Sequence, residues 1–235
     1  MVIAANGGSD LVYLPGGDRP GIATKVVDAL LAQDYVSGIF VDEALGHFAG
    51  TLPLSSINLA GGAVTPVPAI AVNFKSFHVD SPVCPTWLTC TVEVADTTLQ
   101  QGQGMHGTFS RADTFNFMAA IGPSFKHGYV DHMPASNADI GQTIARLMRL
   151  PIDARPNGHL IGRVLEETLD QGHEAPATRG QLASSPASNG LRTIVEYQQV
   201  GDTRYFSAGG FAGRTVGLDA QGHADRLVDE STNPR

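Results

Sequence analysis

The sequence predicts an α/β fold, and three observations lead to this prediction. Short apolar runs alternate with a helical pattern over residues 2–74. A helix with clear start and stop signals follows near residue 140, and two alternating segments after residue 190 are typical of an antiparallel strand pair. The length of 235 residues and the 42% of hydrophobic residues are sufficient for a substantial core.

The first elements surround a glycine turn. Val2–Ala5 and Leu11–Leu14 are short apolar segments on either side of Asn6-Gly7-Gly8. An Asn-Gly turn between two apolar runs is a strong hairpin signal, because both residues tolerate the positive φ that such turns require. We therefore expect two antiparallel strands. A domain seldom begins inside a buried strand, and we expect further sequence upstream of Met1.

A helix and two more strands are expected next. From Gly21 to Gln33 apolar residues recur at helical spacing, namely Ile22, Val26, Val27, Leu30 and Leu31. Ile39–Val41 and Ala69–Phe74 are compact apolar runs of strand length. Together with the hairpin, these segments predict a sheet covered by a helix.

The middle of the chain predicts a strand and a second helix. Met118–Ile121 has the composition of a strand and is closed by Gly122 and Pro123. The helix is expected over Asn137–Leu150. Ser136 and Asp139 have the spacing of a capping box, cations occupy the last turn, and Pro151 stops the helix. Its apolar residues form one face: Ile140, Ile144, Leu147, Met148 and Leu150.

The last part combines a loop, a strand pair and a tail. Residues 172–190 are rich in Ala, Ser, Pro and Gly and predict an exposed loop. Thr193–Val200 and Arg204–Phe206 are expected to form the antiparallel pair, and the polar residues 224–235 a frayed tail. We interpret residues 1–235 as part of one domain.

Charge and hydropathy exclude some partners. The formal net charge is −8, from 15 basic and 23 acidic residues, so a nucleic acid polymer is not an expected partner. No apolar run approaches the roughly 20 residues of a membrane span, and we expect no membrane partner. Cys84 and Cys90 allow two interpretations, a small disulfide loop or two half-buried thiols. The cellular compartment stays open, with a periplasmic or secreted location among the options.

One histidine is displayed on a loop of glycines. His106 lies within Gly102-Gln103-Gly104-Met105-His106-Gly107. Glycines let the backbone bend closely and leave the ring unshielded, and a neutral imidazole is the commonest protein ligand for zinc. The alternative is a turn histidine that hydrogen-bonds to the backbone.

The segment that follows resembles a known family. GQGMHGTFSRADTFNFMAAIGPSFKHGYVDHMPASNADIGQTIARLMRL is similar to the carboxy-terminal metal-binding segment of the alkaline phosphatase superfamily, in particular the type I phosphodiesterase and nucleotide pyrophosphatase group. The matching features are His106-Gly107, Gly122-Pro123, Phe125-Lys126 and the stretch from Pro134 to Asp139. Weaker likeness extends from ANGGSDLVYLP to YFSAGGFAGRTVGL.

The resemblance implies the carboxy-terminal portion of an alkaline phosphatase-like α/β/α sandwich that hydrolyses phosphate esters. It implies that His106 is the last histidine of a site for two divalent ions, with zinc expected, which activate a nucleophile and stabilise the leaving oxygen. Asp113 and Asp139 are candidates to orient the metal-bound imidazole. Arg111 is a candidate to face a phosphate or to pair with Asp113. The expected substrate is a small phosphate ester or nucleotide.

The sequence also departs from the family pattern. It contains no Asp-His-Gly motif, and Asp131-His132 is followed by Met133. We expect the nucleophile and most metal ligands upstream of Met1, so the partner of this chain is the missing amino-terminal half of the domain and the chain alone is inactive. The alternative is a non-catalytic binding or interaction module that keeps the fold.

Overall fold

The computed structural model forms two compact units. The first unit comprises Met1–Asn116, Gln181–Glu196 and the chain from Phe206 onward, and the second comprises Phe117–Gly180 and Tyr197–Tyr205. The expectation that both belong to one hydrolase domain stays a prediction. The residues that the structure describes are 1–59, 66–79, 81–84, 90–100, 103–104, 106–151 and 162–224.

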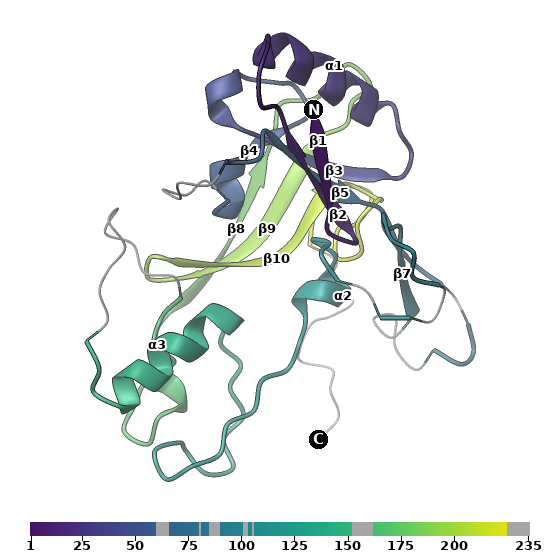
Figure 1. Ribbon diagram of the computed structural model, residues 1–235. Helices are drawn as coiled ribbons and strands as arrows, with labels where there is room; N and C mark the ends of the chain where they lie inside the picture. Colours follow the sequence, from purple (N-terminus) through teal and green to yellow (C-terminus); the bar gives the residue numbers. More distant parts are fainter. Residues whose placement is uncertain are drawn as a thin grey trace. The chain divides into compact units, whose positions relative to one another are not determined.

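The first unit is built on a five-stranded sheet with the order β1-β2-β5-β3-β4 (Figure 1). The strands are β1 Val2–Ala5, β2 Ser9–Tyr13, β5 Ile70–Phe74, β3 Val36–Val41 and β4 Leu52–Pro53. β1 and β2 form the predicted antiparallel hairpin, β5 pairs antiparallel with both β2 and β3, and β3 pairs parallel with β4. The predicted strands are therefore confirmed, in a mixed sheet.

Helix α1, Arg19–Leu31, confirms the first predicted helix and begins two residues earlier than expected. The Asp18 side chain accepts a hydrogen bond from the Gly21 N–H, and Pro20 occupies the first turn, where its missing N–H costs nothing. Ala23 and Val27 are buried in a cluster with sheet residues such as Ile39 and Val72. The helix therefore covers one face of the sheet.

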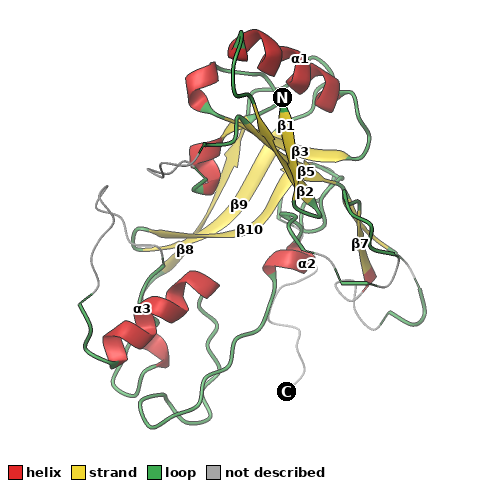
Figure 2. Cartoon of the chain, in the orientation of Figure 1, coloured by secondary structure: helices red, strands yellow, loops and turns green. Residues whose placement is uncertain are grey.

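The other face of the sheet packs against that part of a second sheet which belongs to the first unit. β8 Ala177–Ala183, β9 Thr193–Val200 and β10 Thr203–Phe211 form an antiparallel sheet with the order β10-β9-β8 (Figure 2). Phe40 and Ala71 of the first sheet share a buried cluster with Val195 of β9. These contacts hold the first residues of β9, which belong to the first unit, against the five-stranded sheet. The chain is therefore of mixed α/β class.

The predicted carboxy-terminal pair is confirmed, but the loop prediction for 172–190 is wrong over β8. β8 carries mostly exposed side chains, so no apolar pattern marks it in the sequence. The strand exists because its backbone pairs with β9. Of the predicted tail, only Ala224 lies among the described residues.

Short elements complete the first unit. β6 Ser76–His78 pairs antiparallel with β7 Thr91–Glu93, and a disulfide joins Cys84 to Cys90. The structure thus adopts the first of the two interpretations of these cysteines. The remaining elements are α2 Arg111–Thr114 and the 3₁₀ helices Glu43–Leu45 and Leu54–Ile57.

In the second unit, helix α3 Asn137–Leu147 confirms the predicted second helix, three residues shorter. The capping box is present: Ser136 Oγ accepts from the helix and the Asp139 side chain accepts from the Ser136 N–H. The predicted apolar face is largely exposed, with Ile144 at 49% and Met148 at 63% exposure. The second unit also contains the 3₁₀ helix Glu166–Thr168.

The strand predicted at Met118–Ile121 is wrong. These residues have no regular structure, and Ile121 is fully exposed. A strand needs a neighbouring strand for its backbone groups, which composition alone does not supply. In the described part of the chain, no helix is long and apolar enough to cross a membrane.

Candidate functional site

The His106 loop is held through its backbone and leaves its side chain exposed. The His106 carbonyl accepts a hydrogen bond from the Gly8 N–H at 3.1 Å, which ties the loop to the β1–β2 turn. The His106 side chain is exposed. Of the loop glycines and their neighbours, Gly102 and Met105 lie outside the described residues. The imidazole is therefore accessible to a ligand from a backbone position that the hairpin fixes.

Glycine is required at the contact between these two segments. Gly107 has φ +106°, and a Cβ added there would lie 2.3 Å from the Asn6 carbonyl oxygen. A Cβ on Gly8 would lie 2.1 Å from Thr108 Cγ2. Both distances are far below a van der Waals contact, so the two glycine segments meet more closely than any other residue allows.

We expect the substitution Gly107→Ala to destabilise the first unit by about 2–3 kcal/mol, because it combines a left-handed backbone with a backbone clash. Gly190→Ala is the matched control: Gly190 has φ +83° but open space around its Cβ position. The control should cost only about 1 kcal/mol. Urea unfolding of both variants measures the difference, and equal losses would show that the contact with Asn6 does not matter.

Beyond Gly107, a Thr108 hydroxyl links two carboxylates. Thr108 Oγ1 lies 2.8 Å from Glu93 Oε1 and 3.0 Å from Asp113 Oδ2, and it accepts a hydrogen bond from the Ser110 N–H. Asp113 Oδ2 also accepts from the Thr108 N–H at 2.7 Å. The candidate residue Asp113 thus stabilises this turn by accepting hydrogen bonds from Thr108.

A single hydroxyl hydrogen cannot serve both carboxylates. Burial raises the pKa of Glu93, and the charge of Asp113 raises it further, although the Thr108 hydrogen bond acts against both. A protonated Glu93 would donate to Thr108 Oγ1 and free the hydroxyl hydrogen for Asp113, which satisfies all three groups. Sequence reasoning missed Glu93, because its partners come from a distant segment.

Asn73 fixes the backbone on the far side of Thr108. Asn73 is 2% exposed. Its Oδ1 accepts from the Phe109 N–H at 2.9 Å, and its Nδ2 donates to Ser37 Oγ at 2.7 Å and to the Gly209 carbonyl at 3.2 Å. Every polar group of the Asn73 side chain is therefore used inside the core.

Arg111 begins the short helix α2, for which Ser110 is the N-cap. Its guanidinium lies over the Phe115 ring, 4.4 Å from the centroid. This cation–π contact, worth on the order of 0.5–1 kcal/mol at an exposed site, holds the side chain along the helix. Arg111, Asp113 and His106 all belong to the first unit.

Asp139 belongs to the second unit and is fully buried there. Its oxygens accept hydrogen bonds from the Ser136 N–H at 2.8 Å, the Arg163 N–H at 2.7 Å and the Tyr205 hydroxyl at 3.2 Å. These contacts support the role of a helix cap. Burial, followed by the charge of Asp139, raises the pKa of Tyr205, so the phenol stays protonated as a donor.

A buried ion pair lies beside Asp139. Arg163 Nη1 donates to Glu167 Oε2 at 2.7 Å and Nη2 to Glu167 Oε1, a two-pronged contact. Glu167 is 1% exposed. Burial acts to raise the pKa of Glu167, but the Arg163 hydrogen bonds outweigh it and the pKa is lowered.

The described residues do not assemble a complete metal centre. Among them, no group of three or more His, Cys, Asp or Glu side chains could hold a metal ion. One accessible imidazole suits zinc chemically, but a catalytic zinc takes about three protein ligands. In the described part of the chain, His106 is therefore a candidate for a single ligand and not for a complete site. Comparisons with protein-family models, with curated proteins and with solved structures found no match for this chain.

Proposed function

We propose that this chain is the carboxy-terminal part of a metal-dependent phosphate-ester hydrolase of the alkaline phosphatase superfamily, with His106 as one of its metal ligands. The observation that carries the proposal is the exposed imidazole of His106 on a loop whose backbone is hydrogen-bonded to Gly8 of the β1–β2 turn. The resemblance from Gly102 to Leu150 supplies the reaction class, and the finer α/β/α architecture is part of the same proposal.

The way in which the loop is built supports this role. The loop backbone is fixed at the Gly8 hydrogen bond and again at Thr108 and Phe109, while the His106 ring is left accessible. Such an arrangement sets the position of a ligand before a metal arrives, which lowers the ordering cost of binding. Bound metal would supply charge for the phosphoryl oxygens, and the role of His106 is to hold it.

Exposed apolar surface supports the expectation that more protein completes the domain. β1 is an edge strand, and its residues Val2 and Ile3 are 55% and 53% exposed. In the second unit, Ile144 of α3 and Met148, which caps its carboxyl end, are exposed as well. An open strand edge with exposed apolar side chains invites pairing with another strand.

The first test is a zinc titration of the purified chain followed by NMR of the imidazole groups. We expect the His106 ring signals to shift first among the eight histidines, with weak affinity because one imidazole is not a complete site. His106→Ala should abolish the early shift. His132→Ala is the matched control, since Asp131-His132 is the competing motif, and it should leave the early shift unchanged.

The same preparation should not hydrolyse an aryl phosphodiester above background with zinc present. Turnover that His106→Ala leaves intact would contradict the proposal, as would a titration in which another histidine responds first. A folded chain in which no imidazole responds to millimolar zinc would instead favour the non-catalytic module.

A further inference from the structure

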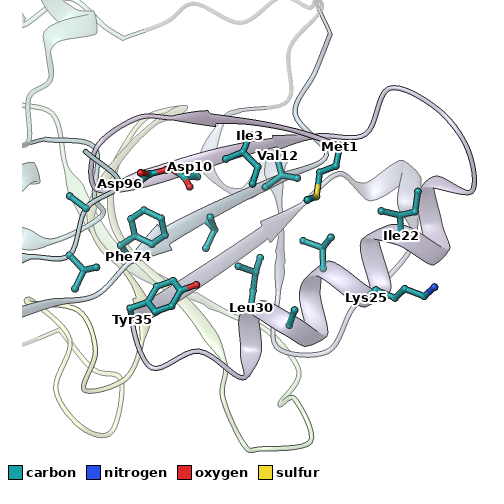
Figure 3. Close-up of a pocket in the computed structure, with 15 residues that line it drawn as sticks. Met1, Ile3, Asp10, Val12, Ile22, Lys25, Leu30, Tyr35, Phe74 and Asp96 are labelled. Carbon is teal, nitrogen blue, oxygen red and sulfur yellow. The ribbon is translucent and has the colours of Figure 1, made fainter. Parts of the chain in front are cut away.

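An apolar pocket lies between helix α1 and strands β1, β2 and β5 (Figure 3). Its volume is about 630 Å³, within the range of pockets that hold small organic ligands. All lining residues belong to the first unit. Most of its walls are apolar side chains, which include Ile3, Val12, Ile22, Leu30, Val72 and Phe74.

One end of the pocket is acidic. Figure 3 shows the carboxylates of Asp10 and Asp96 close together, near Phe74, whereas Lys25 lies at the opposite end and points away. Asp10 comes from β2, and Asp96 is held next to it because its N–H donates to the Gly7 carbonyl at 3.0 Å. Two carboxylates therefore lie near each other at one end of an apolar pocket.

Asp10 has an unused acceptor in this pocket. The residue is only 8% exposed, and its Oδ1 has no hydrogen-bond donor among the residues that the structure describes. A buried carboxylate oxygen without a donor costs on the order of 1–3 kcal/mol or more. Burial and the charge of Asp96 raise the pKa of Asp10, and a hydrogen bond from the Asn6 main chain acts in the opposite direction. The pocket therefore favours an added positive charge or an added donor.

We propose that this pocket binds an organic ammonium ion, with the charged head group at Asp10 and Asp96 and the apolar body between α1 and the sheet. An ammonium group supplies both the hydrogen that Asp10 Oδ1 lacks and the charge that two adjacent carboxylates need. Apolar walls suit a carbon chain or ring. A hydrated divalent ion fits less well, because such ions take six or more oxygen ligands.

The experiment uses the full chain and three probes of equal length: hexylammonium, 1-hexanol and hexanoate. Binding is measured by calorimetry and by the methyl signals of Val12 and Leu30 in phosphate buffer, because an amine buffer would compete. We expect a millimolar dissociation constant for hexylammonium, at least tenfold weaker binding of hexanol, and none of hexanoate.

Three variants separate the proposal from nonspecific binding. Asp10→Asn should weaken hexylammonium binding roughly tenfold, while Asp28→Asn, on the exposed surface of α1, should leave it within twofold. Asp10→Asn removes a charge that burial already disfavours, so the fold should persist. Ala29→Trp, at an exposed α1 position that lines the pocket, should block all probes.

Hexanol binding as strong as hexylammonium binding would overturn the proposal. So would an Asp10→Asn protein that binds the amine as the unaltered chain does. Because Ala29→Trp changes the pocket without touching either carboxylate, amine binding that survives it places the amine elsewhere and overturns the proposal as well.

Discussion

Replacement of Asn73 by alanine is expected to lower the free energy of unfolding of the first unit by about 3–4 kcal/mol. The side chain is buried and makes three hydrogen bonds, to Phe109 N–H, Ser37 Oγ and the Gly209 carbonyl. Truncation strands these groups away from water and leaves a cavity, and the two costs add. Urea unfolding followed by circular dichroism measures the loss.

The matched control is Asn116→Ala. Asn116 is exposed, and its Nδ2 donates to the Asp113 carbonyl at 2.7 Å. Water can replace that hydrogen bond, so the loss should stay below about 1 kcal/mol. In Asn73→Ala we also expect faster amide exchange at Phe109. A loss of stability in Asn73→Ala no larger than that in Asn116→Ala would show that the hydrogen bonds of Asn73 do not hold the Thr108–Ser110 turn.

The sequence predicted elements whose signals are local. The hairpin followed from Asn6-Gly7-Gly8, and α3 followed from the capping-box spacing of Ser136 and Asp139, which the structure reproduces. In both cases the groups that define the element lie within a few residues of one another. Local sequence is then sufficient, because no distant partner decides the outcome.

Elements that depend on distant partners could not be predicted in the same way. Asn73 ends an apolar strand, and only contacts 36 and 136 residues away show that it is a buried hub. β8 is a strand by virtue of its neighbour β9, whereas Met118–Ile121 had strand composition and no such neighbour. Pairing therefore mattered more than propensity in these segments.

In the candidate site, too, features with local sequence signals could be predicted and features that depend on distant residues could not. The accessible position of His106 could be predicted from its glycines, and Asp113 could be chosen for its nearness in sequence. The hydrogen bond from Thr108 to Glu93 could not be predicted, since Glu93 lies 15 residues before Thr108, at the end of strand β7. Glycine patterns indicate where the backbone can bend. The hydrogen bonds of the Thr108 hydroxyl with Glu93 and Asp113 depend on which side chains the fold brings together.

In the second unit, we expect Arg163→Met to cost about 3 kcal/mol at pH 7. The substitution leaves the Glu167 carboxylate buried without its cation, and an unpaired buried charge is far more costly than a pair. The matched control is Arg146→Met. Arg146 makes a similar contact with Glu166 at 3.2 Å, but both side chains are substantially exposed, so the loss should be under about 0.5 kcal/mol.

The double variant Arg163→Met/Glu167→Met tests whether the loss of stability comes from losing the ion pair or from leaving the Glu167 charge buried without a counter-ion. With both charges removed and apolar side chains in their place, most of the lost stability should return. A double variant as unstable as Arg163→Met alone would contradict this account, because the cost would then come from lost packing or from the Arg163 contacts to Pro134 and Val164.

The pH dependence should change sign between the two proteins. In the unaltered chain the pKa of Glu167 is lowered, so its contribution to stability is present above the unfolded pKa and is lost as pH falls through the folded pKa. In Arg163→Met the Arg163 contacts are lost, and burial, the largest influence on the Glu167 pKa, is opposed by hydrogen bonds from the Glu167 main chain and from Asp131. We expect burial to prevail and the pKa to be raised, so the contribution of Glu167 is present at low pH and lost as pH rises.

The stability difference between the unaltered chain and Arg163→Met should therefore be large at pH 7 and shrink toward pH 4. Asp131, whose pKa burial and Glu167 raise, contributes in the opposite sense to Glu167 in the unaltered chain, so the difference between the proteins is the quantity to follow. A difference that is constant from pH 4 to pH 7 would mean that Glu167 does not titrate with the pair. In that case Arg163 would act through its backbone contacts and not as the counter-ion of a buried carboxylate.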